Sequence, residues 1–200
     1  MKFRQPYIID GVYYGYMNTK ISFMVSMGVV AVTAGILYFM GRVIMSTSGA
    51  LMLWVGDTGS AELSQQISDW YTASHFIHGI LFFGLLYFFR KQLTVGTRLV
   101  IATVIESGWE ILENSSIIID RYRESTIAIG YTGDSILNSV SDIIFMIFGF
   151  FFTRYVPVWV AVLTVIVLEV LVGYLIRDNL LLNIIMLIYP MDAIKVWQGG

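Results

Sequence analysis

No cysteine occurs among the 200 residues, so disulfides, thiolate metal sites, iron–sulfur clusters and cysteine nucleophiles are excluded. Charged residues make up only 13% of the chain, against about 25% in a typical soluble domain. The formal net charge is -2, and no run of Lys and Arg is interleaved with aromatic residues, so no nucleic-acid partner is expected. The chain is instead 57% hydrophobic, with a mean hydropathy of +0.75, which indicates that lipid is its main solvent.

Long apolar runs predict the fold class. A membrane-spanning helix needs about 20 apolar residues, and four runs reach about that length, while a fifth is shorter and begins with polar residues. We predict an all-α fold, a polytopic transmembrane helical bundle that forms a single domain over residues 1–200. The expected spans are 21–44, 73–89, 99–119, 135–153 and 157–176, with an outer loop at 45–72.

The stretch 180–190 is apolar but too short to cross a bilayer, and Pro190 ends any helix there. We therefore expect a re-entrant or interfacial helix at this place.

Lys and Arg in short loops indicate the orientation of the bundle. Lys2, Arg4 and Lys20 precede the first span, which we expect to act as an uncleaved insertion signal, and three basic residues follow the second span. The loop 45–72 carries acidic residues without any Lys or Arg. We expect a cytoplasmic N-terminus and an outward-facing loop, although Arg121 and Arg123 then lie on the outer side, which suggests a local role for them.

This orientation brings the polar ends of four spans to the outer leaflet. The residues concerned are His75 and His78, Glu106, Glu110 and Glu113, Asp134, Asn138 and Asp142, and Arg177 with Asp178. Spacings of three and four place each acidic set on one face of a helix. A carboxylate at the centre of a span costs about 2.5–3.5 kcal/mol, so these groups need partners, water or a metal ion.

Structural roles remain open for several of these residues. The two histidines could simply hydrogen-bond to neighbouring helices, and Glu113 could be solvated at the membrane surface. Asp134 precedes a helix in the string GDS, where it could act as an N-cap. Glu106 lies about 10 Å deeper than Glu113 along the helix, which favours a functional or network role for it.

Three polar segments carry a family resemblance: SQQISDWYTASHFIHG, ESGWEILENSSIIIDRYRESTIAIGYTGDSILNSVSD and RDNLLLNIIMLIYP. They resemble the domain-of-unknown-function family 2585, also called uncharacterised protein family 0314, of bacterial inner-membrane proteins. That resemblance implies the bacterial inner (plasma) membrane and brings no established activity with it. More distantly, the order of polar residues is similar to that of VanZ-like membrane proteins. The corresponding residues here are His75 or His78, Glu110 or Glu113, Arg121 or Arg123, and Asp134 with Asn138.

Two classes of function fit these residues. The first is binding of a lipid headgroup, an ion or a lipid-linked ligand in an outer-leaflet pocket, with membrane lipids as partners. The candidate binding residues are Asn114, Arg121, Arg123, Asn138, Asp142, Arg177 and Asp178.

The alternative is a membrane-embedded hydrolase or transferase that acts on a lipid-linked substrate. Its candidate catalytic residues are His75, His78, Glu110, Glu113 and Asp134. His75, His78, Glu110 and Glu113 could hold a divalent metal ion such as zinc, manganese or iron, or a histidine could act as general base without metal.

Two further hypotheses stay open. The strings IIIDRYRES and ILNSVSDII are similar to those around the aspartates of intramembrane aspartyl signal peptidases. Asp134 and Asp142 would lie about 12 Å apart on one helix, so Asp120 or Asp178 would have to approach Asp134. The carboxylates could also serve a proton relay or a small transporter, although no internal repeat supports alternating access.

Overall fold

The structure is a computed structural model that describes residues 19–46, 48–126 and 130–199. Its regular elements in these ranges are helical, and one isolated parallel bridge joins Val55 to Asp69. The elements are α1 Thr19–Phe39, α2 Thr72–Leu86, η1 Tyr87–Phe89, α3 Val95–Glu113, α4 Ser116–Ser125, α5 Ile136–Tyr155, α6 Val158–Ile176, α7 Leu180–Ile188 and α8 Asp192–Gly199. The expectation of an all-α fold is confirmed for this part of the chain.

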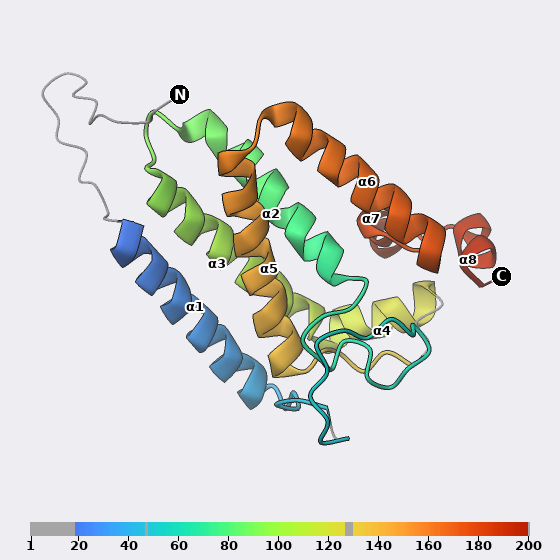
Figure 1. Ribbon diagram of the computed structural model, residues 1–200. Coiled ribbons are helices and arrows are strands. Elements are labelled where there is room, and N and C mark those ends of the chain that lie inside the picture. The colour runs from blue at the N-terminus through green and yellow to red at the C-terminus, as the bar shows by residue number, and fades with distance from the viewer. Residues whose placement is uncertain (1–18, 47, 127–129, 200) are drawn as a thin grey trace, which may run out of the picture.

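The long helices lie side by side, and α4 crosses the end of the bundle where α3 stops (Figure 1). The most extensive packing joins α2 to α5 and α1 to α3. Two glycines allow the first of these contacts, because a Cβ on Gly79 would lie 2.0 Å from the carbonyl oxygen of Met146, and one on Gly149 would lie 2.0 Å from that of Phe76. The apolar core between the helices is formed by Val30, Leu86, Leu99, Ala102, Ile143, Met146, Ile147 and Phe150.

Three helices in the described ranges are long and apolar enough to cross a membrane: Lys20–Phe39, Ile136–Tyr155 and Val158–Ile176. The chain is therefore a helical protein with the composition and helix lengths of a membrane protein. The apolar helix of the expected second span is shorter, at Thr72–Tyr87. The expected third span falls on α3, whose 19 residues include Arg98 and three glutamates.

The third span differs from the expected 99–119. Helix α3 ends at Glu113 with Asn114 as its C-cap, and the chain turns before α4 begins at Ser116. The side chain of Asn114 donates to the carbonyl oxygen of Glu110, so it competes with the continuation of the helix. Arg98 is one of the three basic residues expected in the loop after the second span. It instead lies in α3, where it is 4% exposed and its guanidinium lies 5.2 Å from the centre of the Phe83 ring.

The C-terminal stretch forms two short helices, α7 and α8, on either side of Pro190. The backbone amides of Leu180 and Leu181 donate to the two carboxylate oxygens of Glu169 in α6, each at 3.1 Å. The carboxylate of Glu169 is thus satisfied by the N-terminus of α7, whose positive end favours an anion.

The long loop before α2 is tied to the start of α5. The amides of Ser135, Ile136 and Leu137 donate to the carbonyls of Ser64, Val43 and Ile44, at 2.8–3.0 Å. These bonds satisfy amide groups at the start of α5 that have no partner within the helix. They also hold the polar start of α5 beside the start of α2.

Candidate functional site

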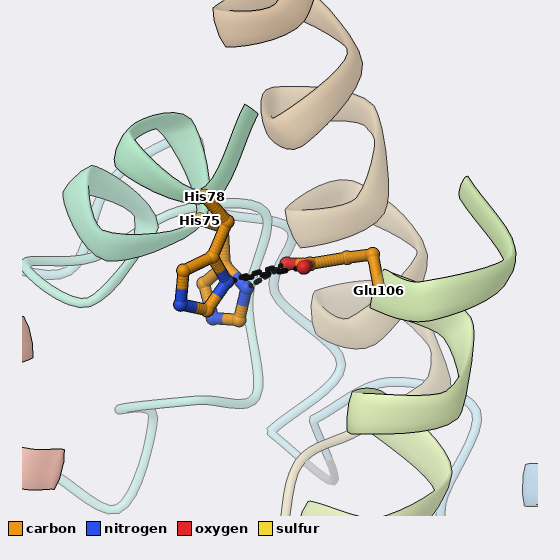
Figure 2. A group of neighbouring side chains, drawn as sticks. All are labelled: His75, His78 and Glu106. Carbon is orange, nitrogen blue, oxygen red and sulfur yellow. Dashed lines mark hydrogen bonds and ion pairs between the residues drawn. The ribbon is translucent and has the colours of Figure 1, made fainter. Parts of the chain in front are cut away.

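Two histidines of α2 share one carboxylate of α3. His75 Nδ1 lies 2.7 Å from Glu106 Oε1, and His78 Nδ1 lies 3.0 Å from both oxygens of Glu106. Figure 2 shows both rings pointing from α2 toward Glu106. Positions 75 and 78 fall on one face of the helix because their spacing is close to one turn. Glu106 is fully buried, so the pair satisfies a carboxylate that has no access to solvent.

Further acids surround His75. Its Nδ1 lies 3.4 Å from Glu110 Oε1, and its Nε2 lies 3.8 Å from Asp142 Oδ2 on α5. Asp142 also accepts a hydrogen bond from the hydroxyl of Thr72, at 3.1 Å. Glu110 is fully buried, and neither of its carboxylate oxygens has a hydrogen-bond partner within the described residues. We call His75, His78, Glu106, Glu110, Glu113 and Asp142 the histidine–carboxylate cluster.

Asp134 lies in a second hydrogen-bonded group at the same end of the bundle. Its carboxylate accepts hydrogen bonds from the Tyr131 hydroxyl at 2.9 Å and from the Asn114 amide at 3.3 Å. Burial raises the pKa of Asp134 to about 6, although the bond from Tyr131 opposes this shift. Asp134 is not the N-cap of α5, because the side chain of Ser135 caps that helix by accepting from the amide of Asn138.

The remaining candidates, on α5 and at the end of α3, also form hydrogen bonds. Asn138 donates to the carbonyl oxygen of Gln66 at 3.0 Å, and Glu113 accepts from the Tyr122 hydroxyl at 3.1 Å. Asn114 additionally donates to the Ser139 hydroxyl at 3.2 Å. The histidines, Glu110, Glu113, Asn114, Asp134, Asn138 and Asp142 therefore gather where α2 and α5 begin and α3 ends.

The arginines point elsewhere. Arg121 donates to the carbonyl of Leu187 at 2.9 Å, Arg123 to that of Tyr131 at 2.6 Å, and Arg177 to that of Trp197 at 3.2 Å. Arg121 thereby satisfies a carbonyl in the last turn of α7. Within the described part of the chain, the ion pairs of the cluster carboxylates are made by histidines alone.

Asp178 is the centre of a separate network at the end of α6. It accepts hydrogen bonds from the Tyr71 hydroxyl, the Asn179 amide and the side chains of Asn183 and Gln198, at 2.9–3.2 Å. Burial raises its pKa to about 6. Neither Asp178 nor Asp120, which pairs with Arg123 at 3.5 Å, makes a hydrogen bond or ion pair with Asp134, so the described contacts give no aspartyl dyad.

Two overlapping sets of side chains have the donor geometry of a metal site. In the first set, His75, His78 and Glu106 each offer one donor atom, and these atoms lie within 4.8 Å of one another. In the second set, one donor atom each from His75, Glu110 and Glu113 also lie within 4.8 Å of one another. Imidazole nitrogen and carboxylate oxygen suit zinc, manganese and iron(II). His75 belongs to both sets, so it is the common donor of the cluster.

Comparison with known proteins shows the family of this chain. The family model described as "Protein of unknown function (DUF2585)" matches residues 37–200. The chain belongs to the DUF2585 family. A UPF0314 protein of Rhizobium johnstonii is 51% identical over 178 residues, which cover 89% of this chain and 91% of that relative. A UPF0314 protein of Paracoccus denitrificans is 49% identical over 172 residues, which cover 86% of this chain and 89% of that relative. No solved structure matches the chain.

Sequence reasoning missed several residues of the site. Glu106 was expected to have a functional or network role but was left out of the metal donor set, although it contacts both histidines. Thr72 and Tyr131 gave no signal, because one hydroxyl at a helix start or in a loop has no periodic pattern. Gln66 lies in the long loop before α2, and its contact with Asn138 depends on how that loop folds back onto α5.

Proposed function

We propose that this DUF2585 protein is a multi-pass membrane protein that binds a divalent metal ion in the histidine–carboxylate cluster, with His75, Glu110 and Glu113 as ligands. The observation that carries this proposal is Glu110, a fully buried carboxylate whose oxygens accept no hydrogen bond. A buried carboxylate without a hydrogen-bond donor is costly, and beside the His75 imidazole at 3.4 Å it needs a proton or a further cation.

The charge balance of the cluster supports a cation. Four carboxyl groups face two imidazoles, and the three arginines expected to bind ligand donate to backbone carbonyls instead. Even with both imidazoles protonated, the ionised cluster would keep an excess of negative charge. A divalent ion offsets two of these negative charges and can coordinate the Glu110 oxygens that accept no hydrogen bond.

Glu106 is not one of the proposed metal ligands, and its hydrogen bonds to the histidines suggest another role. Metal-binding histidines commonly donate their second ring N–H to a carboxylate, which fixes the ring and raises its basicity. Asp142, 3.8 Å from Nε2 of His75, is placed for this task if Nδ1 binds the ion. Glu106 approaches the same Nδ1 as Glu110, so it would then keep its hydrogen bond to His78 alone. The second donor set, with His78 and Glu106, is already satisfied by hydrogen bonds of 2.7 and 3.0 Å and gains less from an ion.

We further propose that α1, α2, α3, α5 and α6 all cross the bacterial inner membrane, with the N-terminus in the cytoplasm and the cluster in the outer leaflet. Three of these helices have the length and apolarity of spans. Lys2 and Arg4, which carry part of the orientation argument, lie outside the described residues. The likeness to VanZ-like proteins stays a hypothesis on the order of the polar residues.

Metal content measured by elemental mass spectrometry tests the proposal. The full chain, purified in mild detergent, is stripped with a chelator, reloaded with zinc or manganese and washed. We expect one ion per chain in the parent protein and in Asp57→Asn, a control acid exposed in the outer loop. Glu110→Gln should lose the ion. A parent protein that retains no ion above the level of Glu110→Gln would refute the proposal.

Thermal unfolding separates loss of the site from loss of the fold. A ligand that binds only the folded state stabilises it by about 2.7 kcal/mol at 100 times its Kd, so metal should raise the melting temperature of the parent protein. Glu110→Gln should remain folded without metal and show no such rise.

A second candidate function, hydrolysis or group transfer on a lipid-linked substrate, rests on His78. Its side chain is 16% exposed, whereas that of Glu106 is fully buried, so it is the more accessible partner in this pair. A histidine oriented by a carboxylate is a common general base. Lipid profiling of a deletion strain, complemented with the parent gene or with His78→Ala, tests this reading. The same lipids should accumulate in the deletion and in His78→Ala, and an unchanged lipid profile in the deletion would refute it.

A further inference from the structure

Basic residues gather at the end of the bundle opposite the histidine–carboxylate cluster. The starts of α1, α3 and α6 and the ends of η1 and α5 meet there (Figure 1). The described segments that meet are 19–26, 83–100 and 148–162, and they contain no Asp or Glu. Their basic residues are Lys20, Arg90, Lys91, Arg98 and Arg154. These segments therefore offer positive charge without any carboxylate to pair with it.

Arg98 is the buried member of this group. It is the fourth residue of α3 and is 4% exposed. Its Nε and Nη1 atoms are buried and donate to no acceptor among the described residues. Nη2 is not enclosed in this way, so the guanidinium has one edge that a ligand can reach. A buried cation whose N–H groups lack acceptors is costly, which indicates an anionic partner from outside this part of the chain.

Aromatic rings fix the position of this guanidinium. Its Cζ lies 5.2 Å from the centre of the Phe83 ring and 5.9 Å from that of Tyr87, and the Cζ of Arg90 lies 4.4 Å from the same Tyr87 ring. The ring faces attract cations but are weak hydrogen-bond acceptors. The contacts therefore hold two guanidinium groups beside one ring and leave the N–H groups of Arg98 without a strong acceptor.

Arg154 adds a third positive charge from the last turn of α5. The charges of Arg90 and Arg154 both act on Arg98, and because all three are positive they repel one another. This repulsion is not offset by any acid of the segments that meet here. An anion bound among the three guanidinium groups would offset it and would accept from the free N–H groups of Arg98.

We propose that Arg90, Arg98 and Arg154 bind a phosphate group. The planar fork of a guanidinium matches the oxygens of phosphate, and several arginines together suit its charge. The group can belong to a phospholipid headgroup or to a soluble phosphate compound, because both present the same oxygens. The three helices that are long and apolar enough to cross a membrane all begin or end here, which favours a headgroup as the source.

The proposal does not depend on metal binding, because the arginines and the histidine–carboxylate cluster share no side chain. Only the assignment of the headgroup to the inner leaflet rests on the proposed orientation. A result at one site therefore leaves the other untouched.

Binding to the delipidated full chain in a neutral detergent tests the proposal with two probes. Native mass spectrometry measures the first dioleoyl phosphatidylglycerol bound, and calorimetric titration at constant ionic strength measures inorganic phosphate. We expect Arg98→Met to weaken binding at least tenfold. Lys91→Met, which removes an exposed positive charge from the same end, is the matched control and should change it less than twofold. Arg154→Met serves if Arg98→Met does not fold.

The two probes distinguish the sources of the phosphate group. Dependence on Arg98 for the lipid alone assigns the site to a headgroup, and for inorganic phosphate alone it assigns the site to a soluble compound. Equal affinity of the parent protein and Arg98→Met for both probes would overturn the proposal. Equal losses in Arg98→Met and Lys91→Met would also overturn it, because general charge attraction would then explain the binding.

Thermal unfolding without either probe distinguishes a binding role of Arg98 from a packing role. Arg98→Met removes a buried charge that two others repel and keeps a long apolar side chain beside Phe83. We therefore expect it to melt no lower than the parent protein. A lower melting temperature together with unchanged binding of both probes would show that Arg98 serves only to pack against the rings.

Discussion

The contact between α2 and α5 depends on Gly79, and replacing this glycine by alanine gives a sharp test of how the site is positioned. A Cβ at this position would lie 2.0 Å from the oxygen of Met146 and 2.6 Å from the amide nitrogen of Phe150. Both obstacles are backbone atoms, so no rotamer change relieves the clash. Ordinary contact begins near 3.4 Å. The two helices would therefore have to separate by about 1.4 Å.

The cost follows from this displacement. Overpacking costs about 1–3 kcal/mol, and the Thr72–Asp142 hydrogen bond would stretch from 3.1 Å to about 4.5 Å, at a further cost of about 1 kcal/mol. The higher helix propensity of alanine offsets about 1 kcal/mol of this destabilisation. We expect Gly79→Ala to lower the free energy of unfolding by about 2 kcal/mol and the melting temperature by about 4–8 °C.

Thermal unfolding in detergent, followed by tryptophan fluorescence, measures this effect. Gly84→Ala on the same helix is the control, because its Cβ would meet nothing within 4 Å and should raise the melting temperature slightly. If Gly79→Ala and Gly84→Ala melt together, the close approach of α2 and α5 does not exist as described.

Three further outcomes are expected. Burial raises the pKa of Asp178 to about 6, from about 3.8 in the unfolded chain. The folded chain therefore holds the carboxyl proton of Asp178 more tightly than the unfolded chain does. Stability should therefore fall by up to about 3 kcal/mol as the pH rises from about 4 to 6, and Asp178→Asn should flatten this part of a melting-temperature profile against pH. Glu169→Ala removes the acceptor of two α7 amides and should cost about 1–2 kcal/mol in denaturant unfolding, with faster hydrogen exchange at Leu180. Thr72→Val removes the hydroxyl that donates to Asp142 and accepts from the amide of Asp69, each at 3.1 Å, and should cost about 1–3 kcal/mol, whereas Thr72→Ser should preserve most of that stability.

The sequence predicted those parts of the molecule that depend on local pattern. Long, mostly apolar runs identify α1, α5 and α6, because few other structures tolerate 19 or 20 residues of such high mean hydropathy. The spacing of Glu106, Glu110 and Glu113 placed them on one stripe, and Glu106 and Glu110 indeed both lie beside His75.

What the sequence could not predict depends on tertiary contacts. Three isoleucines at 117–119 follow shortly after Asn114 and favour a continuation of the same span, although α3 stops before them. Arg121 looked available for a ligand because its acceptor, the carbonyl of Leu187, is a backbone atom 66 residues away. Glu169 showed no role in the sequence for the same reason, since its partners are amides of a helix that begins 11 residues later.

The hydrogen bonds between Glu169 and the start of α7 make the C-terminal part of the chain necessary for α6. The most apolar of the long helices carries a carboxylate, and the counter-charge comes from a turn of main chain instead of a lysine or arginine side chain. A chain shortened after Ile176 would leave the Glu169 carboxyl group in the middle of α6 without the two amides that donate to it. Such a truncation should therefore impair insertion and assembly of the whole protein.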